Sequence, residues 1–262
     1  MRRILFAVFV LLAAGSSWAY QDEYIEVTLV SEQQTLQPGS TTWLAVKLKP
    51  IDHWHVYWQN PGDAGLAPKV SLSLPEGLTA GEVEWPVPKR MVDADIATYG
   101  YDETLLMFPI SVEDSVNVDQ SATIEAAVRW LVCKEGCIQG SAKLQLTLPV
   151  SAMVPMKTKH AKIFSDTRQH IPQPLPGVAR YQVADNQIKL ELDSPLKVVD
   201  VFPITAELVG YNPAPEVAYA GEGMTIRFPI SEYATDMKKP FDFVVSLSDG
   251  TALQGRAEAM DK

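Results

Sequence analysis

The sequence predicts an all-β protein of two tandem immunoglobulin-like β-sandwiches, joined by a linker that contains a short helix. Three observations support this fold class. Short segments alternate apolar and polar residues, as half-buried strands do. Proline and glycine, with 19 and 15 residues in the chain, separate these segments at turn positions. The chain of 262 residues is longer than a usual single domain, so two domains are expected.

The first 19 residues have the pattern of a secretory signal peptide. Arg2 and Arg3 precede an apolar run over residues 4–14, and the small residues Ser17 and Ala19 stand before a cleavage site after Ala19. The alternative is a membrane anchor, but the run is shorter than the roughly 18 apolar residues that a spanning helix needs. We therefore expect a soluble protein that is exported to the periplasm and has no membrane span after cleavage.

Residues 20–150 are expected to form the first sandwich. Period-two alternation with Pro and Gly turns is typical of the short strands of such a fold. The predicted strands cover residues 24–30, 42–48, 53–58, 69–74, 105–112, 122–132 and 142–148.

Residues 151–177 break this rhythm and are expected to be the linker. Residues 157–170 lack Gly and Pro and predict one short helix, which the proline-rich segment 171–177 ends. Residues 178–262 return to the strand pattern and predict a second, smaller β-sandwich. Its predicted strands cover residues 179–183, 187–192, 196–202, 225–230 and 241–247, with a hairpin turn at 248–251 before a last strand.

The composition excludes several classes of function. The formal net charge is −10, and loss of Arg2 and Arg3 with the signal peptide makes it −12. An acidic surface without basic clusters argues against nucleic acid or anionic lipid as a partner. Four histidines and two cysteines, mostly far apart in sequence, argue against a metal site on ligand count, and no motif indicates a cofactor. No pattern supports hydrolase or nucleotide chemistry, and nothing in the chain demands more than a monomer.

The two cysteines of the chain, Cys133 and Cys137, are separated by three residues in an apolar, strand-like stretch. The connection, residues 134–136, suits a hairpin whose third loop residue, Gly136, has a left-handed conformation. The cysteines would then form a cross-strand pair with a Cα separation that a disulfide tolerates. A helix that places both on one face is the less suitable alternative, because the flanking residues alternate.

This disulfide has two interpretations. Closing so short a loop stabilises a fold by only about 2 kcal/mol in the loop-entropy model, so a purely structural staple would be inefficient. Short bridges at exposed turns are also the ones that are readily reduced. Redox activity is therefore favoured, and a non-enzymatic binding or assembly module with a structural disulfide is the alternative. Lys134 and Glu135 have opposite effects on a thiolate, so the local sequence does not identify the attacking sulfur.

Three other groups have a functional and a structural interpretation. Trp54 and Trp58 are expected to share a strand face and fill the core rather than line a partner groove. His53 and His55 are expected to share a strand face as solvated or hydrogen-bonded residues rather than catalytic ones. The acidic pair at 102–103 could tune the cysteines, but a solvated turn is the simpler interpretation.

Several segments resemble the periplasmic N-terminal region of the DsbD and ScsB family of thiol:disulfide interchange proteins. The resemblance is specific over about residues 40–150 and weaker beyond them. The segments are His53-Trp54-His55-Val56-Tyr57-Trp58-Gln59-Asn60-Pro61-Gly62-Asp63-Ala64-Gly65-Leu66, Leu74-Pro75-Glu76-Gly77-Leu78, Glu84-Trp85-Pro86-Val87-Pro88, Tyr99-Gly100-Tyr101 and Trp130-Leu131-Val132-Cys133-Lys134-Glu135-Gly136-Cys137.

The resemblance implies an immunoglobulin-like domain whose hairpin cysteines, here Cys133 and Cys137, pass electrons between a membrane-linked thioredoxin-like donor and periplasmic redox partners, as in cytochrome c biogenesis. The more C-terminal cysteine, Cys137, would enter mixed disulfides. The partners would be thioredoxin-fold proteins and a separately encoded membrane electron transporter, because the chain as given continues into neither transmembrane helices nor a thioredoxin-like domain.

The resemblance also implies a cap loop over residues 96–100 that shields the cysteines. The DsbD pattern has two acids and a phenylalanine before Tyr-Gly, whereas this chain has Ile96, Ala97 and Thr98 there. Tyr99 or Tyr101 would then be the shielding aromatic. The expected cap and partner contacts are therefore Thr98, Tyr99 and Tyr101.

Overall fold

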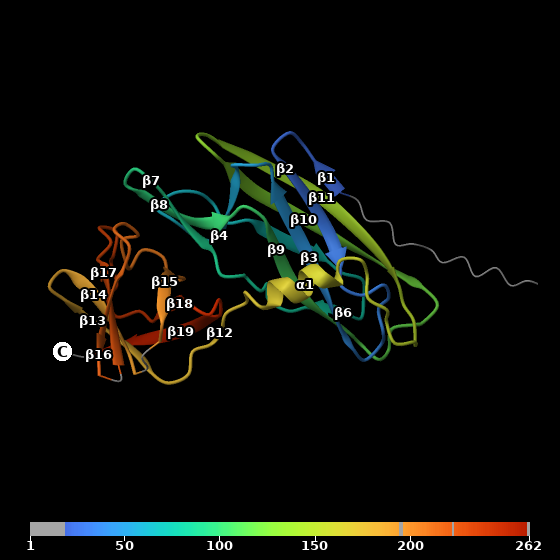
Figure 1. Cartoon of the computed structure of the whole chain (residues 1–262). Helices are drawn as coiled ribbons and strands as arrows, with labels where there is room; N and C mark the ends of the chain where they lie inside the picture. Colours follow the sequence, from blue (N-terminus) through green and yellow to red (C-terminus); the bar gives the residue numbers. More distant parts are fainter. Residues whose placement is uncertain (1–18, 194–195, 222, 261–262) are drawn as a thin grey trace, which may run out of the picture.

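The computed structural model describes residues 19–193, 196–221 and 223–260, and its strands confirm the all-β prediction (Figure 1). The predicted signal peptide, residues 1–19, lies outside the described residues except for Ala19, which begins the first strand. No helix in the described part of the chain is long and apolar enough to cross a membrane.

One sheet of the first region has five strands in the order β1-β2-β3-β9-β6. Neighbouring strands in this sheet are antiparallel. Its strands are β1 (Ala19–Gln21), β2 (Ile25–Ser31), β3 (Thr41–Pro50), β9 (Thr104–Val112) and β6 (Leu78–Ala80).

The other sheet of the first region has six strands. Its order is β11-β10-β4-β8-β7, and β5 pairs with β10 beside β4. Its strands are β11 (Cys137–Pro149), β10 (Ser121–Cys133), β4 (His55–Gly62), β8 (Ile96–Tyr101), β7 (Lys89–Asp93) and β5 (Lys69–Ser73).

Alternation along β10 shows why the two sheets pack face to face. Every second residue from Ala122 to Val132 is buried, and the residues between them are mostly exposed. The buried face of β10 joins residues of β2, β3 and β9 in one apolar core. Burying one face of each sheet against the other removes the apolar side chains from water, which is the main stabilising term of such a fold.

A short helix, α1 (Ala161–Arg168), covers the outer face of the five-stranded sheet. Its Phe164 is fully buried against Ala45, Leu105 and Met107. The Arg168 guanidinium forms an ion pair with Glu32. The predicted helix in the linker is therefore present, and it packs on the first region.

The C-terminal region has eight strands joined into one sheet, in the order β15-β18-β19-β13-β14-β17-β16 with β12 beside β19. They are β15 (Val198–Pro203), β18 (Phe241–Leu247), β19 (Ala252–Ala259), β13 (Ala179–Ala184), β14 (Gln187–Leu192), β17 (Gly223–Pro229), β16 (Glu216–Ala220) and β12 (Gln173–Pro174).

This sheet curls around its own core. Phe228 of β17 and Phe241 of β18 have ring centroids 5.6 Å apart, although three strands separate β17 from β18 in the sheet order. Parallel pairing of β13 with β19 makes the hydrogen bonding continuous. The prediction of two tandem sandwiches is therefore not confirmed, because the strands of this region form one sheet rather than two.

The two regions share an apolar contact that the sequence does not show. Phe202, Val244 and Ala252 of the C-terminal region belong to the same buried cluster as the core of the first region. The Tyr99 ring lies 5.3 Å from Phe202 and 5.6 Å from the Tyr211 ring, centroid to centroid. The proposed boundaries at 150 and 178 therefore divide a chain whose two regions are packed together.

Arg90 of β7 joins the two regions through polar contacts. Its guanidinium donates to both carboxylate oxygens of Asp200, each at 2.9 Å, and to the carbonyl oxygens of Tyr211 and Val201. The side chains of Arg90 and Asp200 are only 10% and 21% exposed. The guanidinium also lies over the Tyr99 ring, 5.0 Å from its centroid. A buried cation with this many acceptors holds the two regions in one orientation.

Replacing Arg90 with alanine should lower the free energy of unfolding by about 3 kcal/mol, because it leaves the Asp200 carboxylate half-buried and unpaired. Urea denaturation followed by circular dichroism measures this loss. Arg256→Ala is the matched control, since Arg256 also contacts both oxygens of one carboxylate, that of Asp242, but is 65% exposed. It should change stability little. Equal losses in the two variants would contradict a special role for Arg90.

Candidate functional site

The two cysteines lie at the tip of a long β-hairpin formed by β10 and β11. The strands pair in register from Ser121 opposite Pro149 to Cys133 opposite Cys137. The two cysteines form a disulfide with their Cα atoms 4.2 Å apart. The predicted three-residue hairpin and cross-strand pair are therefore present.

The loop conformation differs from the prediction in one respect. Gly136 is not among the residues with positive φ. The loop is instead closed by a hydrogen bond from the Lys134 N–H to the Gly136 carbonyl oxygen, at 3.0 Å. A Cβ atom added at Gly136 would meet no atom within 4 Å. This turn therefore needs neither the left-handed freedom nor the small size of glycine.

The two sulfur-bearing residues differ sharply in exposure. Cys133 is 2% exposed, whereas Cys137 and the three loop residues before it are exposed. Cys133, at the end of β10, lies between β11 and β4. Cys137 is the first residue of β11, which is the edge strand of the sheet. A partner can therefore reach Cys137 directly, while Cys133 lies behind it.

Strand β4 supplies the side chains next to the disulfide. His55 is the register partner of Cys133, so the two side chains project from the same face of the sheet. Tyr57, two residues along β4, shares that face, and its hydroxyl lies 3.9 Å from Cys137 Sγ. The His55 and Tyr57 rings meet edge to face with centroids 5.1 Å apart. This surface, formed by His55, Tyr57, Cys133 and Cys137, is called the disulfide face below.

Tyr57 is closely enclosed in this position. The side chain is only 3% exposed, and burial raises the pKa of its phenol. Gly65, at φ +104°, passes so close that an added Cβ would lie 2.2 Å from the Tyr57 ring. Only glycine allows the chain both this conformation and this approach. The phenol therefore stays protonated at neutral pH and remains beside the Cys137 sulfur.

One charged residue near the disulfide face, Asp102, affects His55. Asp102 follows β8, and its carboxylate pairs with the Lys89 ammonium group in an exposed ion pair. Burial lowers the pKa of His55, and the negative charge of Asp102 opposes this effect. Glu103 pairs instead with Lys47 at 2.9 Å. The acidic pair at 102–103 is thus split between two ion pairs, and only Asp102 acts on the disulfide face, through His55.

The three predicted cap residues lie on a strand, β8, and not on a loop. Tyr99 and Tyr101 are buried at 1% and 6% exposure and belong to the core. The Tyr101 hydroxyl donates to the Pro86 carbonyl oxygen at 2.7 Å. Tyr99 contacts the C-terminal region, as described above. Thr98 is half-buried and alternates with Tyr99, so it alone of the three projects from the same face as the disulfide.

The expected aromatic shield therefore comes from another strand. Gly100 of β8 pairs with Tyr57 of β4, and this places Tyr99 and Tyr101 on the opposite face from Tyr57. The ring next to the cysteines is that of Tyr57. The signal was present in the sequence, because strict alternation separates His55 and Tyr57 from the core residues Val56 and Trp58.

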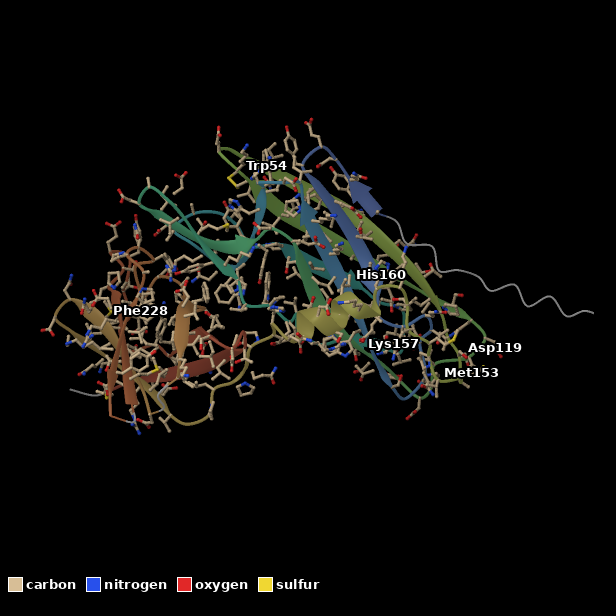
Figure 2. All side chains as sticks on the ribbon, viewed as in Figure 1. Trp54, Asp119, Met153, Lys157, His160 and Phe228 are labelled. Atoms are coloured by element: carbon tan, nitrogen blue, oxygen red, sulfur yellow. A yellow bond between two sulfur atoms is a disulfide. The ribbon has the colours of Figure 1, made fainter. Side chains whose placement is uncertain are left out.

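Two further expectations for this segment have mixed outcomes. Trp58 is fully buried in the core, whereas Trp54 precedes β4, is half-buried and packs against the edge of the core and on Tyr24, with ring centroids 4.7 Å apart. His53 has a left-handed backbone at φ 69° and precedes β4, so it does not share a strand face with His55. Figure 2 shows Trp54 at the opposite end of the first region from Asp119 and Met153.

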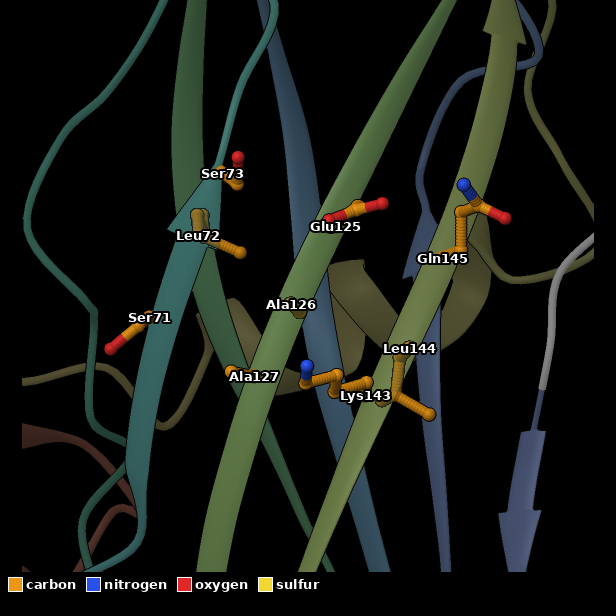
Figure 3. Close-up of a pocket in the computed structure, with 9 residues that line it drawn as sticks. All are labelled: Ser71, Leu72, Ser73, Glu125, Ala126, Ala127, Lys143, Leu144 and Gln145. Carbon is orange, nitrogen blue, oxygen red and sulfur yellow. The ribbon is translucent and has the colours of Figure 1, made fainter.

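The hollow in the surface shown in Figure 3 is not part of this site. It lies over the middle of β5, β10 and β11, with Ser71, Ala127 and Lys143 in one register row. Ala127 and Cys133 are six positions apart on β10, a distance of about 20 Å along a strand. Among the described residues, no group of three or more His, Cys, Asp or Glu is placed to hold a metal ion.

Comparison with known families agrees with this geometry. The family model for the N-terminal region of the thiol:disulfide interchange protein DsbD matches residues 26–149. These residues form a DsbD N-terminal domain. The match covers strands β3 to β11 and nearly all of β2, and it includes the whole β10–β11 hairpin. No curated protein sequence matches the chain.

Solved structures show how far this fold extends. The N-terminal periplasmic domain of ScsB from Proteus mirabilis has a TM-score of 0.69 and 17% identity, with 95% of this chain and 99% of that chain covered. The fold similarity thus includes the C-terminal region. Domains 5-6 of the S-layer protein SbsC and the periplasmic chaperone SfaE both have 12% identity, with TM-scores of 0.25 and 0.22. Those alignments cover 94% and 88% of this chain and the full length of the other chain, but scores this low carry no argument.

After reduction, Cys137 should react with iodoacetamide at least ten times faster than Cys133, because alkylation of a thiolate requires access and only Cys137 is exposed. Mass spectrometry of peptides from a short labelling time measures the ratio. Labelling in urea is the control and should make the two rates similar. Equal labelling of the folded protein would contradict the difference in exposure.

Proposed function

We propose that this protein carries out thiol:disulfide exchange in the periplasm through the Cys133–Cys137 couple. One observation carries the proposal: the DsbD N-terminal domain places at a hairpin tip a disulfide with one exposed and one buried cysteine. Exchange requires a thiolate to approach one sulfur in line with the bond that breaks. An exposed Cys137 in front of a buried Cys133 supports attack at Cys137.

The exchange would proceed in two displacements. A thiolate of a reduced partner attacks Cys137 Sγ, the Cys133–Cys137 bond breaks, and its electron pair leaves on Cys133 as a thiolate. The second thiol of the partner, after losing its proton, attacks the partner sulfur of this mixed disulfide and releases Cys137 as a thiolate. Two electrons pass to this protein, and the partner becomes a disulfide. The reverse sequence reduces the next partner, with Cys133 resolving the mixed disulfide.

The partners follow from this chemistry. Dithiol partners with an accessible cysteine, such as thioredoxin-fold proteins, can provide and accept the electron pair. A separately encoded membrane electron transporter would supply electrons, including those used in cytochrome c biogenesis.

The N-terminal signal pattern supports export, and the similar ScsB domain is described as periplasmic. We place partner contact at the hairpin tip and the half-buried Thr98. In this proposal residues 20–150 are the redox domain, 151–177 the linker and 178–262 the second domain.

A Cys133→Ala variant should trap a mixed disulfide through Cys137 with a thioredoxin-fold protein, because no second thiol remains to resolve it. Non-reducing electrophoresis and mass spectrometry of the periplasmic fraction identify the complex and its linked cysteines. Cys137→Ala is the matched control and should trap little, since Cys133 is buried. The proposal fails if neither variant forms such a complex. A reduction potential below roughly −300 mV would also count against it, because structural disulfides have such values.

A further inference from the structure

Three residues form one row across three strands at the tip of the hairpin. His55 of β4 is opposite Cys133 of β10, and Cys133 is opposite Cys137 of β11. Residues directly opposite one another in antiparallel strands project to the same face, with Cβ atoms about 4.5 to 5.5 Å apart. The imidazole therefore stands beside the buried cysteine, on the side away from the exposed one.

Opening the disulfide places a negative charge on a buried sulfur, that of Cys133. Attack at the exposed Cys137 leaves the negative charge on the sulfur of Cys133, which is 2% exposed. A thiolate removed from water is strongly disfavoured unless a nearby group donates a hydrogen bond to it. The Tyr57 hydroxyl is next to the other sulfur, that of Cys137. A donor for Cys133 therefore has to be another residue, and His55 is the neighbour of Cys133 in the row.

His55 has an unused ring nitrogen at this place. Its Nε2 atom is buried and has no hydrogen-bond partner among the described residues. Such buried polar atoms usually have partners, so an unpaired one needs an explanation. The sulfur of an intact disulfide is a poor acceptor, whereas a thiolate is a strong one. Nε2 has no partner while the disulfide is intact, and it would gain one, the Cys133 thiolate, when the disulfide opens. This explains the unpaired nitrogen.

The charges around His55 favour a neutral ring. Burial lowers its pKa against the opposing effect of Asp102, whose charge is itself paired with Lys89. Tyr57 faces the ring from the same strand and stays protonated. A neutral imidazole carries one N–H, and with the proton on Nε2 it is a donor at that atom.

We propose that His55 stabilises the Cys133 thiolate by donating a hydrogen bond from Nε2 whenever the disulfide is opened. The inference rests on the proposed exchange through Cys137 and adds to it a residue that contacts the leaving sulfur. The electron pair of the broken bond stays on Cys133 Sγ, and the Nε2 proton stays on His55. In the reverse direction the same hydrogen bond keeps Cys133 deprotonated, so that it can attack the mixed disulfide.

Two substitutions of His55 separate hydrogen bonding from packing. His55→Phe keeps a ring without a donor, and His55→Gln keeps an N–H without a ring. In a Cys137→Ser background, His55→Phe should raise the Cys133 thiol pKa by about one unit, measured by the ultraviolet absorbance of the thiolate. In the otherwise unaltered chain it should slow opening of the disulfide by dithiothreitol about tenfold. His55→Gln should restore most of both values.

His53→Asn is the control, because His53 is exposed and asparagine accepts its left-handed backbone. It should leave both values unchanged. The inference is overturned if His55→Phe matches the original chain, or if His55→Gln and His55→Phe have the same effect. Neither measurement needs a protein partner. A protein that shows the His55 effect but traps no thioredoxin-fold partner would therefore overturn the proposed function and not the hydrogen bond.

Discussion

The register of the β10–β11 hairpin is the constraint on which the site depends. Thirteen consecutive pairs, from Ser121 opposite Pro149 to Cys133 opposite Cys137, align the two cysteines across a three-residue loop. A slip of one residue would turn every side chain of a strand to the other face. The buried row of β10 prevents such a slip, because it would expose Ile124, Val128 and Trp130 to water. The apolar core therefore positions the disulfide.

The same register produces the chemical difference between the two sulfurs. Strand β10 has neighbours on both sides at its end, whereas β11 is the edge strand of its sheet. Cys133 is consequently covered by β4 and Cys137 is open to solvent. The side chains that β4 places on this face, His55 and Tyr57, each lie next to one of the two cysteines. A symmetric environment would not distinguish the two sulfurs, whereas this one encloses Cys133 and leaves Cys137 exposed.

Packing of the C-terminal region explains why β8 does not cover the disulfide. Tyr99 lies among Trp58, Phe202 and Tyr211, and Arg90 lies over its ring while it binds Asp200. A tyrosine used in this contact is turned away from the cysteines. The C-terminal region thus fixes β7 and β8, and β4 extends from the disulfide face to the same contact, where Asn60 donates a hydrogen bond to the Pro203 carbonyl oxygen at 2.7 Å. One strand therefore connects the cysteine hairpin to the second region.

The sequence alone determined the all-β class, most strands, the short helix and the cysteine hairpin, because alternation and turn residues are local signals. It also pointed to the DsbD family through motifs around the cysteines. Tertiary structure alone decided that the C-terminal strands form a single curled sheet, and that Tyr99 belongs to an interface and not to a cap. Register across β4, β10 and β11 placed His55 beside Cys133. Such pairings join residues far apart in the chain, and local patterns carry no information about which strand becomes the neighbour of which.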